Sequence, residues 1–161
     1  MNPSRLICSM AALVSAAAAQ AQTSKPNVIV IMTDDVGYGD FSCYGATRVS
    51  TPHIDQLAAR GTRFTDAHAS ASTSTPSRYA FLTGEYPFRR LGTDVAAGNA
   101  GMIIKPEQFT LADLFKRAGY ATAAIGKWHL GLGSKTAQQD WNGQLDQTPA
   151  DLGFDYSCIE A

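Results

Sequence analysis

Short apolar runs alternate along the chain with amphipathic stretches, and this alternation predicts strands and helices in turn. Residues 27–32 (NVIVIM) form a continuous β-branched run, which is typical of a strand buried on both faces. Residues 64–69, 120–125 and 154–159 are further candidate strands. The pattern therefore predicts strands at intervals along the whole chain, with segments of helical period between them.

Three of the intervening segments carry the start and stop signals of helices. They are residues 51–61, 74–84 and 110–119, each of which opens at a Ser or Thr and stops at a Gly. In the third segment Asp113 follows Thr110 by three residues, which is close to a capping box. Because strands and helices alternate, we expect an α/β fold with a mainly parallel sheet flanked by helices.

The composition is that of an ordinary globular protein. The 161 residues include 13 basic and 14 acidic side chains, for a formal net charge of -1, and 45% are hydrophobic. These values exclude an intrinsically disordered chain. The absence of a basic excess argues against a nucleic-acid partner.

The first 21 residues are typical of an export signal. Arg5 opens the segment, residues 6–19 are small and apolar, and Ala19-Gln20-Ala21 supplies an A-x-A cleavage site. The apolar run is shorter than the roughly 20 residues that a membrane span needs, so a membrane anchor is the weaker alternative. We expect cleavage near Ala21, a mature chain with no transmembrane span, and a periplasmic or secreted protein.

Three clusters of reactive side chains stand where strands end or a helix begins. Residues 34–35 (Asp-Asp) end the first predicted strand, residues 74–78 open the second helix, and residues 127–129 follow a later strand. In open α/β sheets the reacting groups gather beyond the carboxyl ends of the strands. We therefore expect the three clusters to converge.

Asp34 and Asp35 are candidate metal ligands. Two adjacent carboxylates cannot both be buried unpaired at low cost, and a hard cation held by oxygen ligands is a natural partner for them. An acidic turn is the alternative explanation for such a pair.

Ser74 and Arg78 open a helix whose N-terminal amides favour anions. Arg78 lies one turn after Ser74 on the same face and offers a planar charged group that matches the oxygens of sulfate or phosphate. A serine hydroxyl alone is a poor nucleophile and needs a base, a metal or chemical conversion. An ordinary helix cap with a surface arginine is the alternative.

Four ordered motifs surround these residues. Residues 74–78 (STPSR), followed by Thr83-Gly84, resemble the sulfatase signature of Cys or Ser, any residue, Pro, Ser, Arg and then Thr-Gly. Three further stretches match the same family in the same order, namely residues 27–40, 51–57 and 126–131. Sulfatases are relatives of alkaline phosphatase, so the resemblance implies the N-terminal portion of an alkaline-phosphatase-like fold. Residues 22–161 would then be the incomplete N-terminal part of a sulfatase catalytic domain.

The resemblance also implies a cofactor set. Ser74 matches the residue that a maturase converts to formylglycine, and serine in place of cysteine is similar to the bacterial, anaerobically matured class. The hydrated aldehyde supplies the oxygen that attacks sulfur, and its second hydroxyl then expels sulfate. Asp34 and Asp35 match the first pair of calcium ligands in the family, and the oxygen at position 74 joins the same ion.

Three further residues match catalytic positions of the family. Arg78 and Lys127 would hold the hydrated aldehyde and offset the charge that develops during transfer. His129 would contact the second hydroxyl and act as a base when the intermediate breaks down. Three neighbouring side chains are expected to have packing or surface roles instead: Trp128, His53 and His68.

The sequence departs from the family pattern in one respect. The family completes its calcium site with a later Asp-Asn pair and places a further Lys and His at the substrate, and none of these occurs before Ala161. The resemblance therefore implies about half an active site. We expect this chain alone to lack measurable turnover.

Sulfated carbohydrate is the expected partner, because export is expected and the family that the chain resembles acts on such substrates. Trp141, Arg89 and Arg90 are candidate contacts for a glycan. Two alternatives stay open: a phosphoesterase or phosphonate hydrolase of the same superfamily that uses unmodified Ser74, and a truncated relic that keeps the fold motifs without catalysis. The intact Ser-x-Pro-Ser-Arg pattern favours sulfate.

Overall fold

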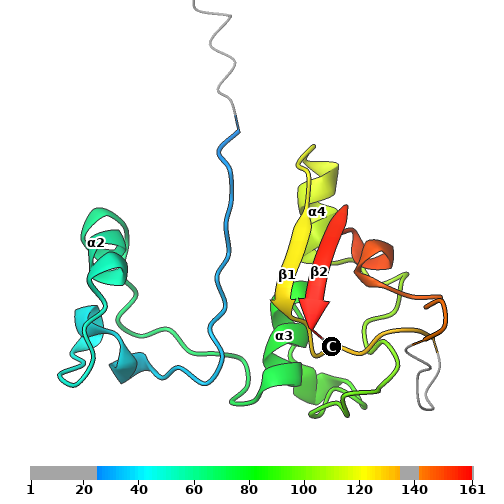
Figure 1. The fold of residues 1–161 in the computed structure, drawn as a ribbon, viewed down its shortest axis with the longest axis horizontal. Coiled ribbons are helices and arrows are strands. Elements are labelled where there is room, and N and C mark those ends of the chain that lie inside the picture. The colour runs from blue at the N-terminus through cyan, green and yellow to red at the C-terminus, as the bar shows by residue number, and fades with distance from the viewer. Residues whose placement is uncertain (1–24, 135–141, 161) are drawn as a thin grey trace, which may run out of the picture. The chain divides into compact units, whose positions relative to one another are not determined.

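The computed structural model describes residues 25–134 and 142–160. The expected export signal at residues 1–21 and Trp141 lie outside this range. The chain divides into two compact units, one up to Val36 and one from Gly37, and each is described by itself. The second unit contains all the regular elements labelled in Figure 1: α2 (Pro52–Arg60), α3 (Ser74–Thr83), α4 (Leu111–Arg117), β1 (Ala123–Lys127) and β2 (Tyr156–Glu160).

The two strands β1 and β2 lie side by side as a parallel sheet (Figure 1). This pairing confirms the predicted parallel arrangement. Both strands begin later than predicted, with Ala123 opposite Tyr156 as the first pair. The cause is local for β1, because the N–H of Tyr120 still donates to the carbonyl of Phe115 at the end of the preceding helix, over 3.0 Å. Tyr120 is still hydrogen-bonded to the helix, so the backbone joins the sheet only from Ala123 onward.

Two predicted strands are wrong. Residues 27–32 have no regular secondary structure, and Ile29, predicted to be buried, is 84% exposed. Residues 64–69 form an irregular segment with a bend. A strand persists only where a neighbouring backbone completes its hydrogen bonds. The described residues of the first unit include no strand that could pair with residues 27–32, so this apolar run forms no inter-strand hydrogen bonds within that part of the chain.

The three predicted helices are confirmed, and their ends follow the expected signals. Gly84 adopts a φ of 69° after α3, and its N–H donates to the carbonyl of Ala80 over 2.8 Å. At the start of α4 the hydroxyl of Thr110 accepts from the N–H of Asp113 over 3.2 Å, and the carboxylate of Asp113 accepts from the N–H of Thr110 over 3.0 Å. This is the complete capping box that the spacing predicts.

A small core joins α3 to the segment that follows β1. Trp128 is only 5% exposed, packs edge-on against the ring of Phe154 at 6.0 Å between centroids, and donates from Nε1 to the carbonyl of Gly131 over 2.9 Å. It packs as the sequence predicts. The buried members of the core are Tyr79, Ile104, Trp128, Leu130, Leu132 and Leu152.

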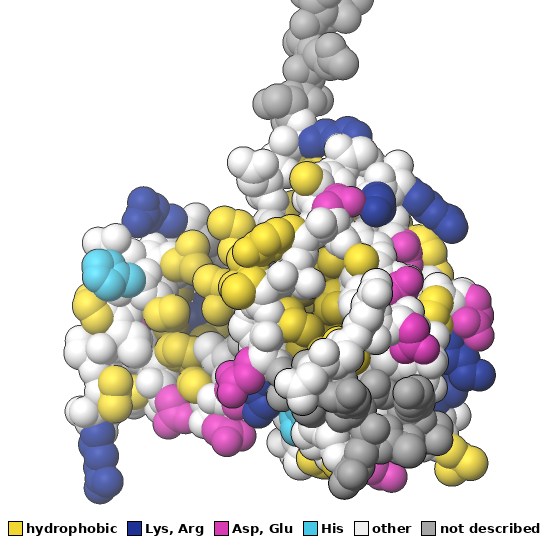
Figure 2. Space-filling view, turned by 45° about the vertical axis from the view of Figure 1, so that its right-hand side comes forward, with side chains coloured by type: hydrophobic (Ala, Val, Ile, Leu, Met, Phe, Trp, Pro, Cys, Tyr) yellow, Lys and Arg dark blue, Asp and Glu magenta, His cyan; other side chains and the backbone are white. Residues whose placement is uncertain are grey.

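Many hydrophobic side chains lie open on the surface, as Figure 2 shows. On the sheet, Ile125 is 76% exposed and Tyr156 is 59% exposed. In the described residues the sheet consists of β1 and β2 alone, so each strand has one edge with no neighbouring strand there. Among residues 25–134 and 142–160 no helix has the length and apolar character to cross a membrane.

Asp155 ties α4 to the start of the sheet. Its carboxylate accepts from Nζ of Lys116 over 2.9 Å, and from the N–H and the hydroxyl of Thr122 over 3.0 and 3.1 Å. The hydrogen bond from Lys116, followed by the one from the backbone of Thr122, holds the pKa of Asp155 below its usual value. A carboxyl with a lowered folded-state pKa contributes stability above the ordinary carboxyl range, and that stability is lost as the pH falls through the folded pKa.

Asp155→Asn is therefore expected to lower the melting temperature of the full-length protein near neutral pH, and to matter progressively less as the pH falls below about 4. Thermal melts over a pH series check this. Asp94→Asn, the same change at another exposed carboxylate, is the control and should shift the melting temperature less. A difference for Asp155→Asn that stays constant into acid would contradict the role given to its charge.

Candidate active site

Ser74 is the first residue of α3, and Arg78 follows it by one turn on the same face. Nε of Arg78 donates to the hydroxyl of Ser74 over 3.0 Å. A terminal nitrogen of the same guanidinium donates to the carbonyl of Lys127 over 2.8 Å, across 49 positions in sequence. Arg78 therefore ties the start of α3 to the end of β1.

His129 brings the segment after β1 to the same hydroxyl. Its Nδ1 lies 3.0 Å from Oγ of Ser74, and its Nε2 lies 2.9 Å from the carbonyl oxygen of Ala96. The backbone of His129 has a φ of 51°, a left-handed conformation that few residues other than glycine adopt. The ring is thus held at both nitrogens, and the backbone turns sharply to place it there.

For a neutral imidazole, the directions of these hydrogen bonds follow from one group that can only accept and one that can only donate. The Ala96 carbonyl only accepts, so Nε2 of the neutral His129 ring carries the proton and Nδ1 is the acceptor. The guanidinium of Arg78 only donates, so it uses a lone pair of the Ser74 oxygen. The Ser74 hydroxyl can then donate to Nδ1. This is the arrangement in which a base draws a proton from position 74.

Lys127 is the last residue of β1 and is exposed. Its backbone carbonyl accepts from Arg78. Of the residues predicted to form the site, the structure brings together the side chains of Ser74, Arg78 and His129 and the backbone of Lys127.

Asp34 and Asp35 belong to the first unit, and both are exposed. Their carboxylates are the oxygen donors that a hard divalent cation prefers. Within residues 25–134 and 142–160, no three His, Cys, Asp or Glu side chains lie together as metal ligands would. The pair therefore fits part of a ligand set for such a cation. Of the three reactive clusters that were expected to converge, two are brought together in the second unit.

The two remaining histidines are surface groups, as the sequence predicts. His53 is exposed on α2. Nε2 of His68 lies 2.8 Å from a carboxylate oxygen of Asp66, and the His68 side chain is 82% exposed. Neither contacts the hydroxyl of Ser74.

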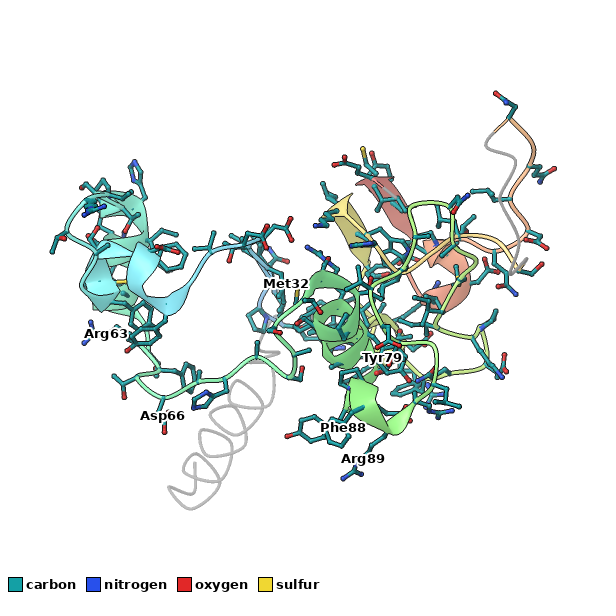
Figure 3. The ribbon with its side chains drawn as sticks, turned by 90° about the horizontal axis from the view of Figure 1, so that it is seen from below. Met32, Arg63, Asp66, Tyr79, Phe88 and Arg89 are labelled. Carbon is teal, nitrogen blue, oxygen red and sulfur yellow. The ribbon has the colours of Figure 1, made fainter. Side chains whose placement is uncertain are left out.

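A hydrogen-bonded network supports α3 just after Arg78. Tyr79, labelled in Figure 3, lies on α3 and is 2% exposed. Its hydroxyl donates to Glu85 over 2.8 Å and accepts from Gln108 over 2.9 Å. Burial raises the pKa of Tyr79, which keeps the phenol a neutral donor. Arg90 donates to both oxygens of Glu85, over 2.9 and 3.1 Å, and lowers the pKa of Glu85. The network fixes the C-terminal half of the helix that carries Ser74.

The basic residues predicted to meet a glycan lie on the turn after α3, Pro87–Arg89 and the next residue. Arg90 is engaged by Glu85. Arg89 instead lies over the rings of Tyr86 and Phe88, at 5.9 and 6.0 Å from their centroids. Figure 3 shows Phe88 and Arg89 at the edge of the body that carries α3.

Thr75 supports the site, although no sequence motif singles it out for that role. It is fully buried; its hydroxyl donates to the carbonyl of His129 over 2.9 Å and accepts from the N–H of Ala96 over 3.1 Å. One sequence signal pointed to its burial, since it precedes the inward-facing Tyr79 by one helical turn. Ala96 contributes only backbone atoms, which no side-chain pattern can reveal.

Comparison with known proteins gives consistent results. The sulfatase family model matches residues 26–160. The chain is 53% identical over 137 residues to an N-acetylgalactosamine-6-O-sulfatase of Bacteroides thetaiotaomicron, an alignment that covers 85% of this chain and 27% of that protein. It is 44% identical over 128 residues to arylsulfatase A of Homo sapiens, covering 78% of this chain and 25% of that one. The chain thus spans about a quarter of the length of these curated relatives.

Solved structures agree. A sulfatase structure described with the metabolism of multiple glycosaminoglycans by Bacteroides thetaiotaomicron superimposes with a TM-score of 0.81 and 54% identity, over 84% of this chain and 28% of that one. Ps i-CgsB in complex with k-i-k-neocarrahexaose superimposes with a TM-score of 0.68 and 33% identity, over 86% and 29%. The parallel sheet and its helices are thus part of the α/β, alkaline-phosphatase-like fold. With residues 26–160 matched by the family model and identity above half to a curated member, this chain belongs to the sulfatase family.

Proposed function

We propose that the protein containing this chain hydrolyses sulfate esters of carbohydrates, with formylglycine at position 74 as its nucleophile. The observation that carries the proposal is the position of the Ser74 oxygen. It lies at the N-terminus of α3, 3.0 Å from Nε of Arg78 and 3.0 Å from Nδ1 of His129. A helix N-terminus with an arginine favours an anion, and the imidazole supplies a base beside it.

Each residue of this cluster then has a distinct task. Formylglycine at position 74 would supply a hydrated aldehyde, one oxygen of which would form a new bond to sulfur while the S–O bond to the leaving alcohol breaks. Arg78 donates a hydrogen bond to the oxygen at position 74 and keeps it at the helix N-terminus. His129 takes up a proton at Nδ1 from the hydroxyl at position 74. The positive charge of Lys127 offsets charge on the sulfate being transferred.

Asp34, Asp35 and the oxygen at position 74 are proposed to hold calcium, which would polarise the sulfate oxygens. The two carboxylates suit a hard cation but make only part of its usual set of six to eight oxygens. Because residues 1–161 span only about a quarter of the length of their curated relatives, we propose that they do not turn over substrate by themselves.

Maturation and export complete the proposal. Ser74 is proposed to lose two electrons and two protons from its Cβ–OH group, which leaves an aldehyde, and a maturase supplies the electron acceptor. Residues 1–21 are proposed to direct export to the periplasm or beyond, with cleavage near Ala21.

A sulfated glycan is the proposed substrate class. It is supported by the relative named as an N-acetylgalactosamine-6-O-sulfatase and by the related structure that holds a neocarrahexaose. The first substrate to test is accordingly a 6-O-sulfated N-acetylgalactosamine.

Mass spectrometry of the tryptic peptide Phe64–Arg78 tests the nucleophile. In the full-length protein produced with a maturase, the peptide is expected to weigh two hydrogen atoms less than its serine form and to react with a hydrazide probe. The Ser74→Ala peptide is the control and should do neither. Unmodified serine in a protein that cleaves phosphate esters and not sulfate esters would favour the phosphoesterase alternative instead.

A further inference from the structure

The hydroxyl of Thr75 links two segments that are far away in sequence. The hydroxyl donates to the carbonyl of His129, 54 positions later, and accepts from the N–H of Ala96, 21 positions later. The side chain is 0% exposed. Neither hydrogen bond goes to the backbone of α3 itself, whose N-cap is Thr73. Thr75 is therefore a tertiary link and has no capping role.

The same two segments also meet at the histidine ring. Nε2 of His129 lies 2.9 Å from the carbonyl oxygen of Ala96, so Ala96 binds the His129 ring through its carbonyl and Thr75 through its N–H. The carbonyl of His129 in turn accepts from Thr75. The result is a closed ring of hydrogen bonds, from Thr75 to His129, from His129 to Ala96, and from Ala96 back to Thr75.

The closed set of hydrogen bonds among Thr75, His129 and Ala96 determines which nitrogen of the imidazole faces position 74. The Ala96 carbonyl accepts only, so it holds the proton of the neutral ring at Nε2 and leaves the lone pair at Nδ1. Thr75 binds the N–H of Ala96, the same residue whose carbonyl meets Nε2, although the two groups belong to the peptide units on either side of its Cα. Thr75 also binds the carbonyl of His129, whose φ of 51° is an uncommon conformation. Both the tautomer and the position of the ring depend on one hydroxyl.

We propose that Thr75 is a positioning residue for His129: its hydroxyl aligns the Ala96 carbonyl with Nε2 so that Nδ1, as an acceptor, faces the oxygen at position 74. Thr75 contacts no reacting atom and acts through His129 and Ala96. The catalytic part of this inference rests on the proposed function. Its structural part, the tautomer, can be measured without any substrate.

The test uses the full-length protein with 15N-labelled histidine rings. Thr75→Val keeps the shape of the side chain and removes the hydroxyl, whereas Thr75→Ser keeps the hydroxyl. Thr110→Val is the matched control, since Thr110 is also buried, at 1% exposure, and its hydroxyl also bridges to a distant carbonyl, that of Leu152. The His129 ring signals are assigned by their absence in His129→Gln.

Three results are expected. The unchanged protein, Thr75→Ser and Thr110→Val show the Nε2-protonated tautomer of His129, whereas Thr75→Val shows a mixture. In Thr75→Val kcat falls by about 10²-fold, as misplacement of a catalytic group by about 1 Å does, while KM changes little. Thr75→Ser recovers most of kcat, and Thr110→Val leaves kcat near its original value.

Other results overturn the proposal. An unchanged tautomer in Thr75→Val would remove its basis, whatever happens to activity. Equal losses of kcat in Thr75→Val and Thr110→Val, with the tautomer unchanged, would show a purely structural hydroxyl. Thr75→Ala is made in parallel in case Thr75→Val does not fold. If neither Thr75 variant folds while Thr110→Val does, the Thr75 hydroxyl has a structural role and the proposal is overturned. If the protein lacks sulfatase activity but Thr75→Val still alters the tautomer, the proposed function fails and the positioning role stands.

Discussion

Arg78→Ala is expected to lower kcat for sulfate-ester hydrolysis by the full-length protein by about 10²- to 10³-fold, the cost of removing one fixed donor from a site where charge develops. Arg78 donates to the oxygen at position 74 and to the carbonyl of Lys127 with the same planar group. Its loss frees that oxygen and also unlinks α3 from the end of β1. Steady-state kinetics on a chromogenic aryl sulfate, normalised to the aldehyde content of the Phe64–Arg78 peptide or its variant, measures the effect.

Two variants serve as controls for this prediction. Arg78→Lys keeps the charge, but one ammonium cannot reproduce the two-pronged geometry, so only part of kcat should return. Arg89→Ala removes an exposed arginine on the following turn and should leave kcat on an aryl sulfate nearly unchanged. A kcat for Arg78→Ala close to that of the unchanged protein, at equal aldehyde content, would remove Arg78 from the mechanism. The same assay on residues 1–161 alone is expected to show no turnover.

The contact of Ser74 with Arg78 is the part of the site that local sequence dictates. A Ser-Thr-Pro start and a closing Gly84 predict the helix, and a spacing of four residues on a helix predicts the contact. The structure shows both, with 3.0 Å between Nε of Arg78 and Oγ of Ser74. No long-range information was needed, because helix geometry alone brings residues i and i+4 together.

The contact of Ser74 with His129 has a different origin. It spans 55 positions in sequence and depends on the turn that begins with the positive φ of His129. The order of the motifs implied that the two residues share a site, but no periodicity could place one ring nitrogen on Ser74 and the other on Ala96. The backbone of Ala96 leaves no trace in side-chain patterns, so this half of the arrangement is visible only in the structure.

The sheet shows the same division between local and distant information. Residues 154–159 are predicted as a strand from their own apolar character, and residues 156–160 pair with β1 in the structure. Residues 27–32 are more strongly apolar and β-branched, yet they form no ladder in the described part of their unit. A hydrophobic run indicates that a segment suits a sheet interior, but its hydrogen bonds depend on a neighbour that the run itself does not specify.

Gly131→Ala is expected to destabilise the protein by about 4 kcal/mol or more, which is exceptional for a single substitution. Two effects add at this position. Its φ of 72° disfavours any side chain, and an added Cβ would lie 1.9 Å from the carbonyl oxygen of Gly101 and 2.9 Å from that of Ala100. Both atoms belong to backbone that is itself bound, since the Ala100 carbonyl accepts from Leu132 over 3.0 Å. The methyl group cannot be accommodated without separating the two segments.

Gly84→Ala is the matched control, because Gly84 has a φ of 69° but an added Cβ would meet nothing within 4 Å. It should cost about 1–2 kcal/mol, the conformational penalty alone. Chemical denaturation of the full-length protein compares the two variants, with soluble yield as the readout if Gly131→Ala does not fold. Since Gly131 lies two residues after His129 and accepts from Trp128 over 2.9 Å, the same change should also displace His129 from Ser74. Equal destabilisation by the two variants would mean that the segments around Gly131 and Gly101 can move apart freely, and that the turn carrying His129 is less constrained than its hydrogen bonds indicate.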